Sequence, residues 1–131
     1  MREAWSLNKL GKHDEALVAG RHAIRLNPSN ANAYCNIGWA LAGLRRYEDA
    51  IEACDKAISL GTRDINIYSH KAWAFNALKR HEEALVASNE AIRLDPTNVY
   101  AYDHKSWALD ALGQHIEADK VSKKAKELYS K

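Results

Sequence analysis

The sequence predicts an all-α solenoid of about four repeated units, each made of a helix, a short turn and a second helix. The four tryptophans, Trp5, Trp39, Trp73 and Trp107, follow one another at a constant interval of 34 residues. Alanine and leucine recur at fixed distances after each tryptophan, and no stretch shows the two-residue alternation of a strand. Such repetition is typical of an array in which each unit buries its apolar face against the next.

Small residues mark where the two helices of a unit approach each other. Alanine stands eleven and eighteen residues after each tryptophan, and leucine stands twenty-one residues after it. Small side chains at fixed helical spacing let two helices pack closely, and the leucines close the far end of the contact. The columns are Ala16, Ala50, Ala84 and Ala118, then Ala23, Ala57, Ala91 and Ala125, and finally Leu26, Leu60, Leu94 and Leu128.

Turn and cap residues set the predicted boundaries of the helices. Each first helix ends at a leucine that is followed by Gly, Arg or Lys, and segments 27–30, 61–64 and 95–98 combine a helix stop with a capping residue. First helices are predicted near 1–10, 31–44, 65–78 and 99–112, and second helices near 13–26, 47–60, 81–94 and 115–129. We therefore predict one domain, 1–131, with repeats at about 1–30 (shortened), 31–64, 65–98 and 99–131.

This pattern resembles the tetratricopeptide repeat over nearly the whole chain. The first-helix aromatic of that family is matched by Tyr34, Tyr68 and Tyr102, its Leu-Gly pair by Ile37-Gly38, and its second-helix aromatic by Tyr47. The chain departs from the family at Lys71-Ala72 and Lys105-Ser106, which replace Leu-Gly, and at His13, His81 and His115, which replace the aromatic. The resemblance implies a right-handed superhelix whose first helices line a concave groove that usually binds peptide.

The tryptophans point away from the predicted core. At about 100° per residue, Trp39 lies about 180° from the centre of the stripe formed by Tyr34, Ile37, Leu41 and Leu44. The tryptophans are therefore not needed to close their own hairpins, and they fall on the face that the family leaves towards the groove. Either the rings contact a ligand there, or each ring lies on its neighbours in adjacent first helices and stiffens the array.

Residues three, four and seven places from each tryptophan share its helical face and complete a candidate binding surface. Amides suit the backbone of an extended peptide, because each carries a donor and an acceptor, although any single one also fits an ordinary solvated side chain. Along this surface the charge runs from basic, at Arg2 and Lys9, to acidic. The predicted peptide-binding residues are Trp5, Asn32, Asn36, Trp39, Asn66, His70, Trp73, Asn76, Tyr100, Asp103, His104, Trp107 and Asp110.

Composition and motifs favour a non-enzymatic binding module. The net charge is +2 with both signs interspersed, and there is no basic stripe or long apolar span, so neither nucleic acid nor membrane is an expected partner. Cys35 and Cys54 form no CxxC pair and fit free thiols in a reducing compartment, which predicts a cytoplasmic protein. The sequence contains no phosphate loop, nucleophile motif or paired metal ligands, so no catalytic residue, metal or cofactor is expected.

The two ends of the array differ. Second helices carry an apolar pair, such as Leu17 and Ile24, which becomes Asp119 and Lys126 in the last repeat and predicts a polar cap there. The short first helix predicts that the second helix is poorly covered around Leu17 and Ile24. A protein or peptide partner in the groove is therefore the expected function, and the alternatives are self-assembly through the N-terminal edge or a fragment of a larger repeat protein.

Overall fold

The computed structural model describes residues 2–130, with side chains from Ala4 onwards. Met1 and Lys131, the ends of the predicted domain, and the side chain of Arg2 lie outside the described residues. The described part of the chain is all-helical, which confirms the predicted fold class. Its helices are α1 (Arg2–Lys9), α2 (His13–Leu26), α3 (Ala31–Gly43), α4 (Tyr47–Ser59), α5 (Ile67–Ala77), α6 (His81–Leu94), α7 (Val99–Ala111) and α8 (His115–Tyr129).

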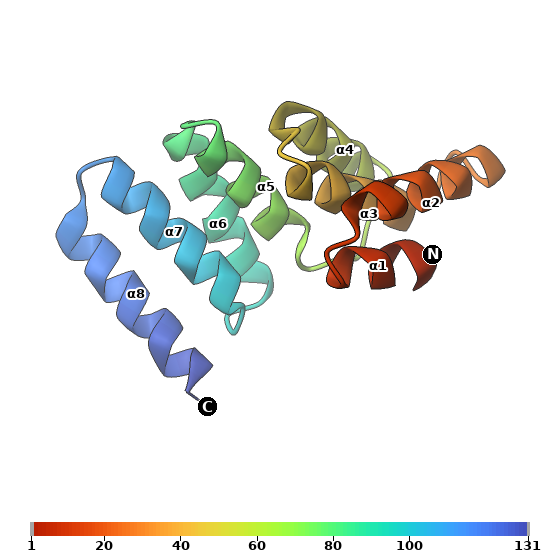
Figure 1. The fold of residues 1–131 in the computed structure, drawn as a ribbon. Coiled ribbons are helices and arrows are strands. Elements are labelled where there is room, and N and C mark those ends of the chain that lie inside the picture. The colour runs from red at the N-terminus through yellow and green to blue at the C-terminus, as the bar shows by residue number, and fades with distance from the viewer. Residues whose placement is uncertain (1, 131) are drawn as a thin grey trace.

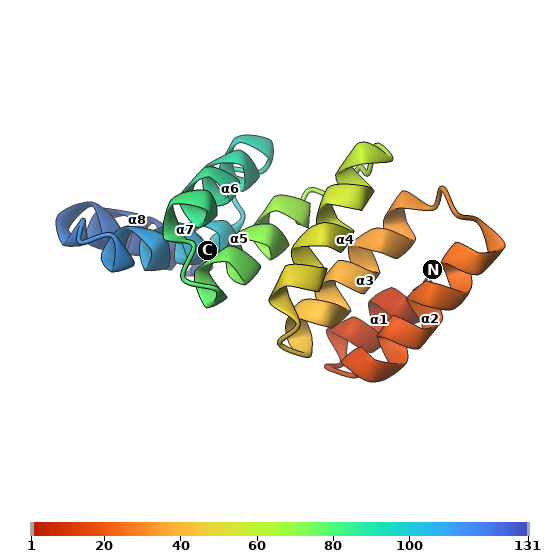
Figure 2. The same cartoon turned by 90° about the horizontal axis from the view of Figure 1, so that it is seen from above.

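The helices pack as sequential pairs that follow one another across the molecule (Figures 1 and 2). Each second helix also packs on the first helix of the next pair, α2 on α3, α4 on α5 and α6 on α7. Consecutive first helices contact each other, whereas within the described residues no two second helices do. The array therefore bends with its first helices on the inner side.

Asparagine caps set the starts of two first helices. The side-chain oxygens of Asn30 and Asn98 accept hydrogen bonds from the third amide of α3 and of α7, at 3.1 and 3.3 Å. Helix α5 differs, because it begins at Ile67 and not at the predicted position 65. Asp64 stands where Asn30 and Asn98 stand, but its carboxylate accepts from the Asn66 N–H at 2.8 Å. That bond holds a turn ahead of the helix and delays its start.

In each turn within a repeat, one residue adopts the left-handed backbone conformation. Gly11 and Gly113 supply it with φ of +77° and +83°, whereas Arg45 and Lys79 adopt 65° and 63° at the same place. Glycine takes this conformation without strain, and other residues do so at a cost. The packing of the helix pair therefore imposes the turn, whichever residue occupies it.

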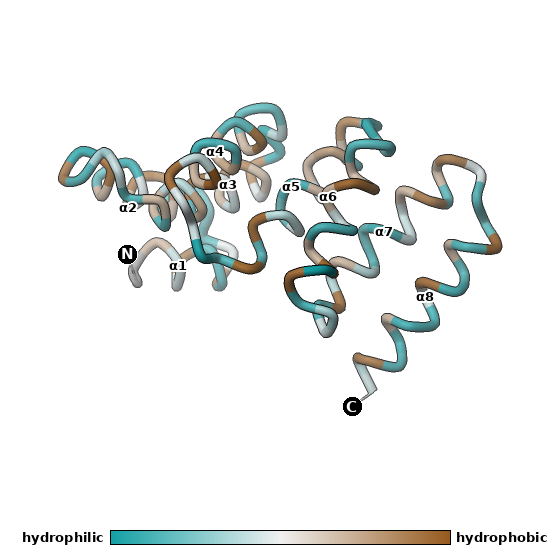
Figure 3. The backbone as a smooth tube through the Cα atoms, turned by 180° about the vertical axis from the view of Figure 1, so that it is seen from behind, coloured by the Kyte–Doolittle hydropathy of each residue, from teal (hydrophilic) through white to brown (hydrophobic). Residues whose placement is uncertain are grey.

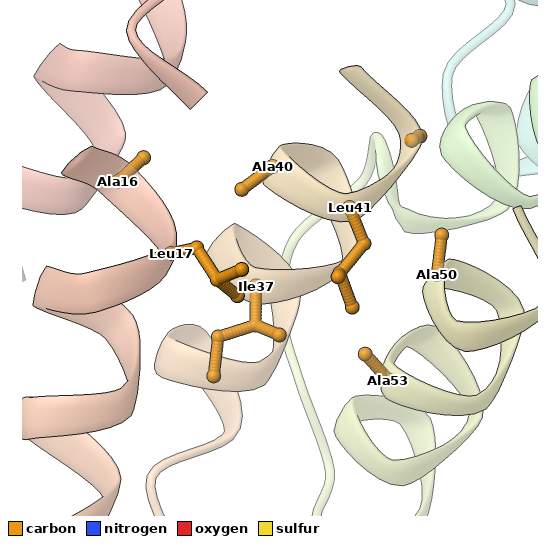
Figure 4. Packing of buried hydrophobic residues seen from close by; sticks show 8 residues of the cluster. Ala16, Leu17, Ile37, Ala40, Leu41, Ala50 and Ala53 are labelled. Atoms are coloured by element: carbon orange, nitrogen blue, oxygen red, sulfur yellow. The ribbon is translucent and has the colours of Figure 1, made fainter. Parts of the chain in front are cut away.

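Close packing in the core depends on small residues, as the sequence predicted. Ala16, Ala50, Ala84 and Ala118 are buried. A Cβ added at Gly38 would lie 2.8 Å from the Cys54 sulfur, so α3 and α4 approach too closely there for a larger residue. In Figure 4, α2, α3 and α4 bring their apolar side chains together in one cluster.

The prediction that α2 is poorly covered is wrong. Leu17 is buried, and Ile24 packs against the same cluster, because α2 lays this face on Ile37 and Leu41 of α3, while Leu7 of the short α1 packs against the cluster as well. At the other end, Asp119 and Lys126 are exposed on α8, which is largely hydrophilic (Figure 3). The polar outer face predicted for the last helix is confirmed.

Candidate binding face on the first helices

The four tryptophans differ in how much of each ring is covered. Trp5 and Trp107, in the first and last repeats, are 48% and 42% exposed, whereas Trp39 and Trp73 are partly buried. The ammonium group of Lys9 lies 4.7 Å from the centre of the Trp5 ring, a cation–π contact within α1. Of the four tryptophans, Trp5 and Trp107 therefore expose the most ring surface.

The middle two rings join neighbouring repeats. Trp39 in α3 lies nearly parallel to the His70 imidazole in α5, with centroids 5.3 Å apart and planes 22° apart. This is the packing expected of a ring that stiffens the array. Trp73 meets the Tyr47 ring edge-on at 6.4 Å and packs against the core cluster of the first two repeats. Both rings thus contribute to the contact between the second and third repeats.

Both polar groups of the Asn76 side-chain amide form hydrogen bonds within the protein. Its side chain is buried, 1% exposed, and Nδ2 donates a hydrogen bond to the backbone carbonyl of His104 in α7 at 3.0 Å. Because Nδ2 is the donor, Oδ1 is the acceptor for His81 Nδ1, 2.9 Å away. We call this arrangement the Asn–His clasp. Since the solenoid itself engages both polar groups of Asn76, we leave this residue out of the surface proposed below.

The Asn–His clasp recurs in the first repeat. Asn8 Nδ2 donates to the carbonyl of Asn36 at 2.8 Å, and Asn8 Oδ1 lies 3.0 Å from His13 Nδ1. The clasp therefore ties α1 to α3 in the same way as it ties α5 to α7. In the sequence, the clasp appears as an asparagine three residues after the tryptophan and a histidine five residues after that asparagine. The sequence analysis did not identify this pairing.

The second and fourth repeats lack the clasp. Ala42 and Tyr47 occupy its positions in the second repeat, where Tyr47 contacts Trp73 instead. In the fourth repeat, Asp110 and His115 occupy them, with 2.9 Å between Oδ1 and Nδ1, and both side chains are exposed. The exposed carboxylate of Asp110 therefore remains part of the candidate face.

The remaining predicted residues lie on α3, α5 and α7 with unequal exposure. Tyr100 is 71% exposed, and Asn32, Asn66 and Asp103 are also exposed. Asn36 is buried, and His70 and His104 are partly buried. The Asn66 side-chain oxygen accepts a hydrogen bond from Asn98 Nδ2 at 3.2 Å, which ties the start of α5 to the start of α7. The described residues available to a ligand are thus mainly two tryptophans, two amides, a tyrosine and two carboxylates.

Burial controls the charge at the centre of this face. Burial lowers the pKa of His70, and the nearby Asp64 carboxylate opposes that effect. Burial, with a smaller contribution from His70, lowers the pKa of His104 to about 4. Burial also raises the pKa of the Asp103 carboxyl above its ordinary value. The two imidazoles are therefore neutral at physiological pH.

Acid should destabilise the fold through His104. In the unfolded chain an ordinary histidine takes up a proton near pH 6.5, whereas folded His104 stays neutral down to about pH 4. Stability that is fully present above pH 6.5 is therefore lost as the pH falls through this window, because the unfolded state binds the proton first. Between about pH 7 and pH 5, we expect this residue to lower the free energy of unfolding by about 2 kcal/mol. Urea unfolding of the H104Q variant should show a smaller loss, and equal losses would contradict the assignment.

Side chains suited to metal binding do not converge on this face. Within residues 2–130, no three His, Cys, Asp or Glu side chains are grouped so that they could hold a metal ion. In the same part of the chain, every helix falls short of the length and apolar character that a membrane crossing requires.

Comparisons with known proteins place this geometry in a family. Three family models described as tetratricopeptide repeat or TPR repeat match residues 6–44, 31–60 and 65–98. A search of curated proteins by sequence found no match. Among solved structures, a crystal structure of MamA is 27% identical, with a TM-score of 0.79, over 97% of this chain and 78% of that one.

Two further structures share the fold at lower identity. MamA residues 41-end from Desulfovibrio magneticus RS-1 is 20% identical, with a TM-score of 0.83, over 97% of this chain and 72% of that one. A thermophilic TPR protein of Thermus thermophilus is 23% identical, with a TM-score of 0.84, over 98% of this chain and 72% of that one. The repeat matches and the shared arrangement of helix pairs agree, and the chain belongs to the tetratricopeptide repeat family, whose domains mediate protein–protein interactions.

Proposed function

We propose that this chain is a non-enzymatic scaffold that binds an extended segment of a partner protein along its first helices, at the face that carries the four tryptophans. The single observation that carries the proposal is the exposure of Trp5 and Trp107, 48% and 42%. A tryptophan can bury about 200 Å² of surface, so two half-covered rings leave about 200 Å² of aromatic area for a partner to cover. The membership of a family of protein-binding repeats supports this proposal.

Polar groups beside the rings suit an extended backbone. Asn32 and Asn66 are exposed, and an amide can both donate to and accept from a peptide group. The charges are unequal at the two ends, with Lys9 beside Trp5 and with Asp103 and Asp110 on the helix of Trp107. A bound segment would therefore place acidic residues near Trp5 and basic residues near Trp107, an arrangement that affects association rate and register more than affinity.

The outer tryptophans provide the test. The partner captured by the wild-type chain should bind the W5A/W107A variant at least about tenfold more weakly, since the exposed rings are anchors of the kind that dominate interfaces. Because both rings are half exposed, thermal unfolding of the variant should stay close to that of the wild type. The measurement is calorimetric titration with the purified partner.

Two exposed apolar residues on α8 give a matched control. Ile116 and Tyr129 are 78% and 83% exposed, and both lie on the last second helix. The I116A/Y129A variant should bind like the wild type, and equal loss in both variants would contradict a specific site at the tryptophans. A captured partner that proves to be a second copy of the chain would favour the self-assembly alternative.

A further inference from the structure

One face of α7 alternates aromatic and acidic side chains. Its residues are spaced three, four and three positions apart, so they leave the helix on the same side in successive turns. They are Tyr100, Asp103, Trp107 and Asp110, and we call them the α7 row. All four are exposed, Tyr100 by 71% and Trp107 by 42%. The row thus places one carboxylate between two exposed aromatic residues and a second carboxylate beyond Trp107.

The α7 row is particular to the fourth repeat. Neutral side chains occupy the positions of Tyr100, Asp103 and Asp110 in the two preceding repeats. They are Asn32, Cys35 and Ala42 in α3, and Asn66, Ser69 and Asn76 in α5. Since those two helices pack in the array without an acidic residue there, the two carboxylates of α7 are not needed to build the solenoid.

The Asp103 carboxylate has no cationic partner within the chain. Burial raises its pKa, and no neighbouring charge counters that effect. None of the ion pairs within the described residues involves Asp103, and none involves the lysines on and beside α7, which include Lys79, Lys105 and Lys126. Asp110 Oδ1 lies 2.9 Å from His115 Nδ1, but that ring is charged only when it is protonated. Negative charge therefore stands uncompensated beside aromatic surface.

The first repeat shows which group such a ring accepts. Lys9 stands four residues after Trp5, and its ammonium nitrogen lies 4.7 Å from the centre of that ring. Ala111 occupies the equivalent position after Trp107, so the fourth repeat has the ring and two carboxylates but lacks the cation. A cation from a partner would gain from both the ring and the carboxylates.

Asp110 argues against another helix of the repeat type as the occupant of this face. At the same position, Asn76 donates a hydrogen bond from Nδ2 to the His104 carbonyl of the following first helix, over 3.0 Å. A carboxylate has no donor, so Asp110 cannot hold a following helix in that way. The α7 row is therefore better suited to a cationic side chain than to a helix stacked on the array.

We infer that the α7 row binds an arginine side chain of the partner segment. The guanidinium group pairs with Asp103 and lies against the Trp107 ring. Tyr100 flanks it on the other side, and Asp110 adds negative charge. Arginine fits better than lysine, because its planar group can stack on a ring while it donates to a carboxylate, and because it is less strongly hydrated. This inference rests on the proposed function, since it names one residue of the bound segment.

Titration with blocked single amino acids tests the inference without the partner. The probes are the N-acetyl methyl amides of arginine, of lysine and of citrulline, which is a neutral isostere of arginine. Proton–nitrogen NMR spectra of the full chain should show the indole N–H of Trp107 shifting with arginine, while that of Trp5 stays in place. Arginine should bind at least about threefold more tightly than lysine and about tenfold more tightly than citrulline. Equal affinities for arginine and lysine, or no shift at Trp107, would overturn the inference.

The third repeat supplies a matched variant. D103S/D110N gives α7 the side chains that Ser69 and Asn76 provide in α5, and it should weaken arginine binding at least about fivefold. The D119N/E127Q variant removes two negative charges from exposed positions of α8 and should bind arginine like the wild type. Equal losses in both variants would show that only the overall charge matters and would overturn the site.

The first repeat supplies a second variant, in which the chain fills the site itself. A111K places a lysine at an exposed position four residues after Trp107, as Lys9 stands after Trp5. It should weaken arginine binding at least about fivefold. The pKa of Asp103, followed by NMR, should fall in this variant and also when arginine binds to the wild type, since a nearby cation favours the ionised carboxylate. Unchanged arginine binding by A111K would contradict the inference.

The partner experiment on the outer tryptophans separates this inference from the proposed function. If the W5A/W107A variant loses the partner but the wild-type chain does not bind blocked arginine, the proposed function stands and the arginine site is wrong. If the variant keeps the partner although blocked arginine shifts Trp107 in the wild type, the proposed function is wrong and the partner segment does not carry the arginine.

Discussion

Replacing Trp73 by alanine should lower the free energy of unfolding by about 3 kcal/mol, whereas the same change at Trp107 should cost less than about 1 kcal/mol. Trp73 packs against the core cluster of the first two repeats and meets the Tyr47 ring edge-on at 6.4 Å. Truncation therefore leaves a cavity at the junction of α4 and α5. Trp107 is 42% exposed, so alanine there removes less packing.

Urea unfolding followed by circular dichroism measures both changes. Trp73 and Trp107 belong to the same column of the repeat, so the comparison holds residue type and helix position constant. Equal and small losses for both variants would contradict a structural role for Trp73. Equal and large losses would show that Trp107 also supports the fold, and would remove it from the proposed binding face.

The four tryptophans stand at the same position of successive repeats but differ in burial, and this difference bears on the proposed function. Trp39 and Trp73 contact His70 and Tyr47, so a ligand meets their partly covered edges only. Under the proposed function, we therefore expect Trp5 and Trp107 to make most of the contact to a bound segment. The column that the sequence presents as uniform is structural in its middle and exposed at its ends.

The helices could be predicted closely because their signals are local. The bounds predicted for α2, 13–26, and for α6, 81–94, agree with His13–Leu26 and His81–Leu94. Turn residues, caps and the alanine columns lie within the segments that they define. Helix α5 was placed two residues early because Asp64 forms a turn where its counterparts cap a helix.

Contacts between repeats could not be predicted in the same way, since they depend on how one repeat is offset from the next. The Trp39 ring meets a residue 31 positions further along, His70, and Asn76 reaches the carbonyl of His104. Helical periodicity places Trp39 and Asn76 on a face but does not say whether a neighbouring repeat covers it. For the same reason the sequence did not show that Leu17 is covered. The covering residues belong to α3, in the next repeat.

Replacing Asn76 by alanine should cost about 3 kcal/mol of stability, although it removes only a few atoms. The change leaves the partly buried carbonyl of His104 without its donor, and it leaves the partly buried His81 Nδ1 without its acceptor. Each buried polar group that loses its partner costs about 1–3 kcal/mol. The loss therefore arises from two partly buried polar groups that lose their hydrogen-bond partners when the amide is removed.

The second repeat supplies the control for this prediction. It carries Ala42 and Tyr47 at the positions of Asn76 and His81, so the N76A/H81Y variant recreates an arrangement that the chain already uses. We expect the double variant to be more stable than N76A by about 1 kcal/mol, because tyrosine replaces a histidine that lacks its partner and adds apolar contact area. Urea unfolding of the three proteins measures the difference. An N76A variant within about 0.5 kcal/mol of the wild type, a loss typical of surface changes, would show that the clasp does not join α5 to α7.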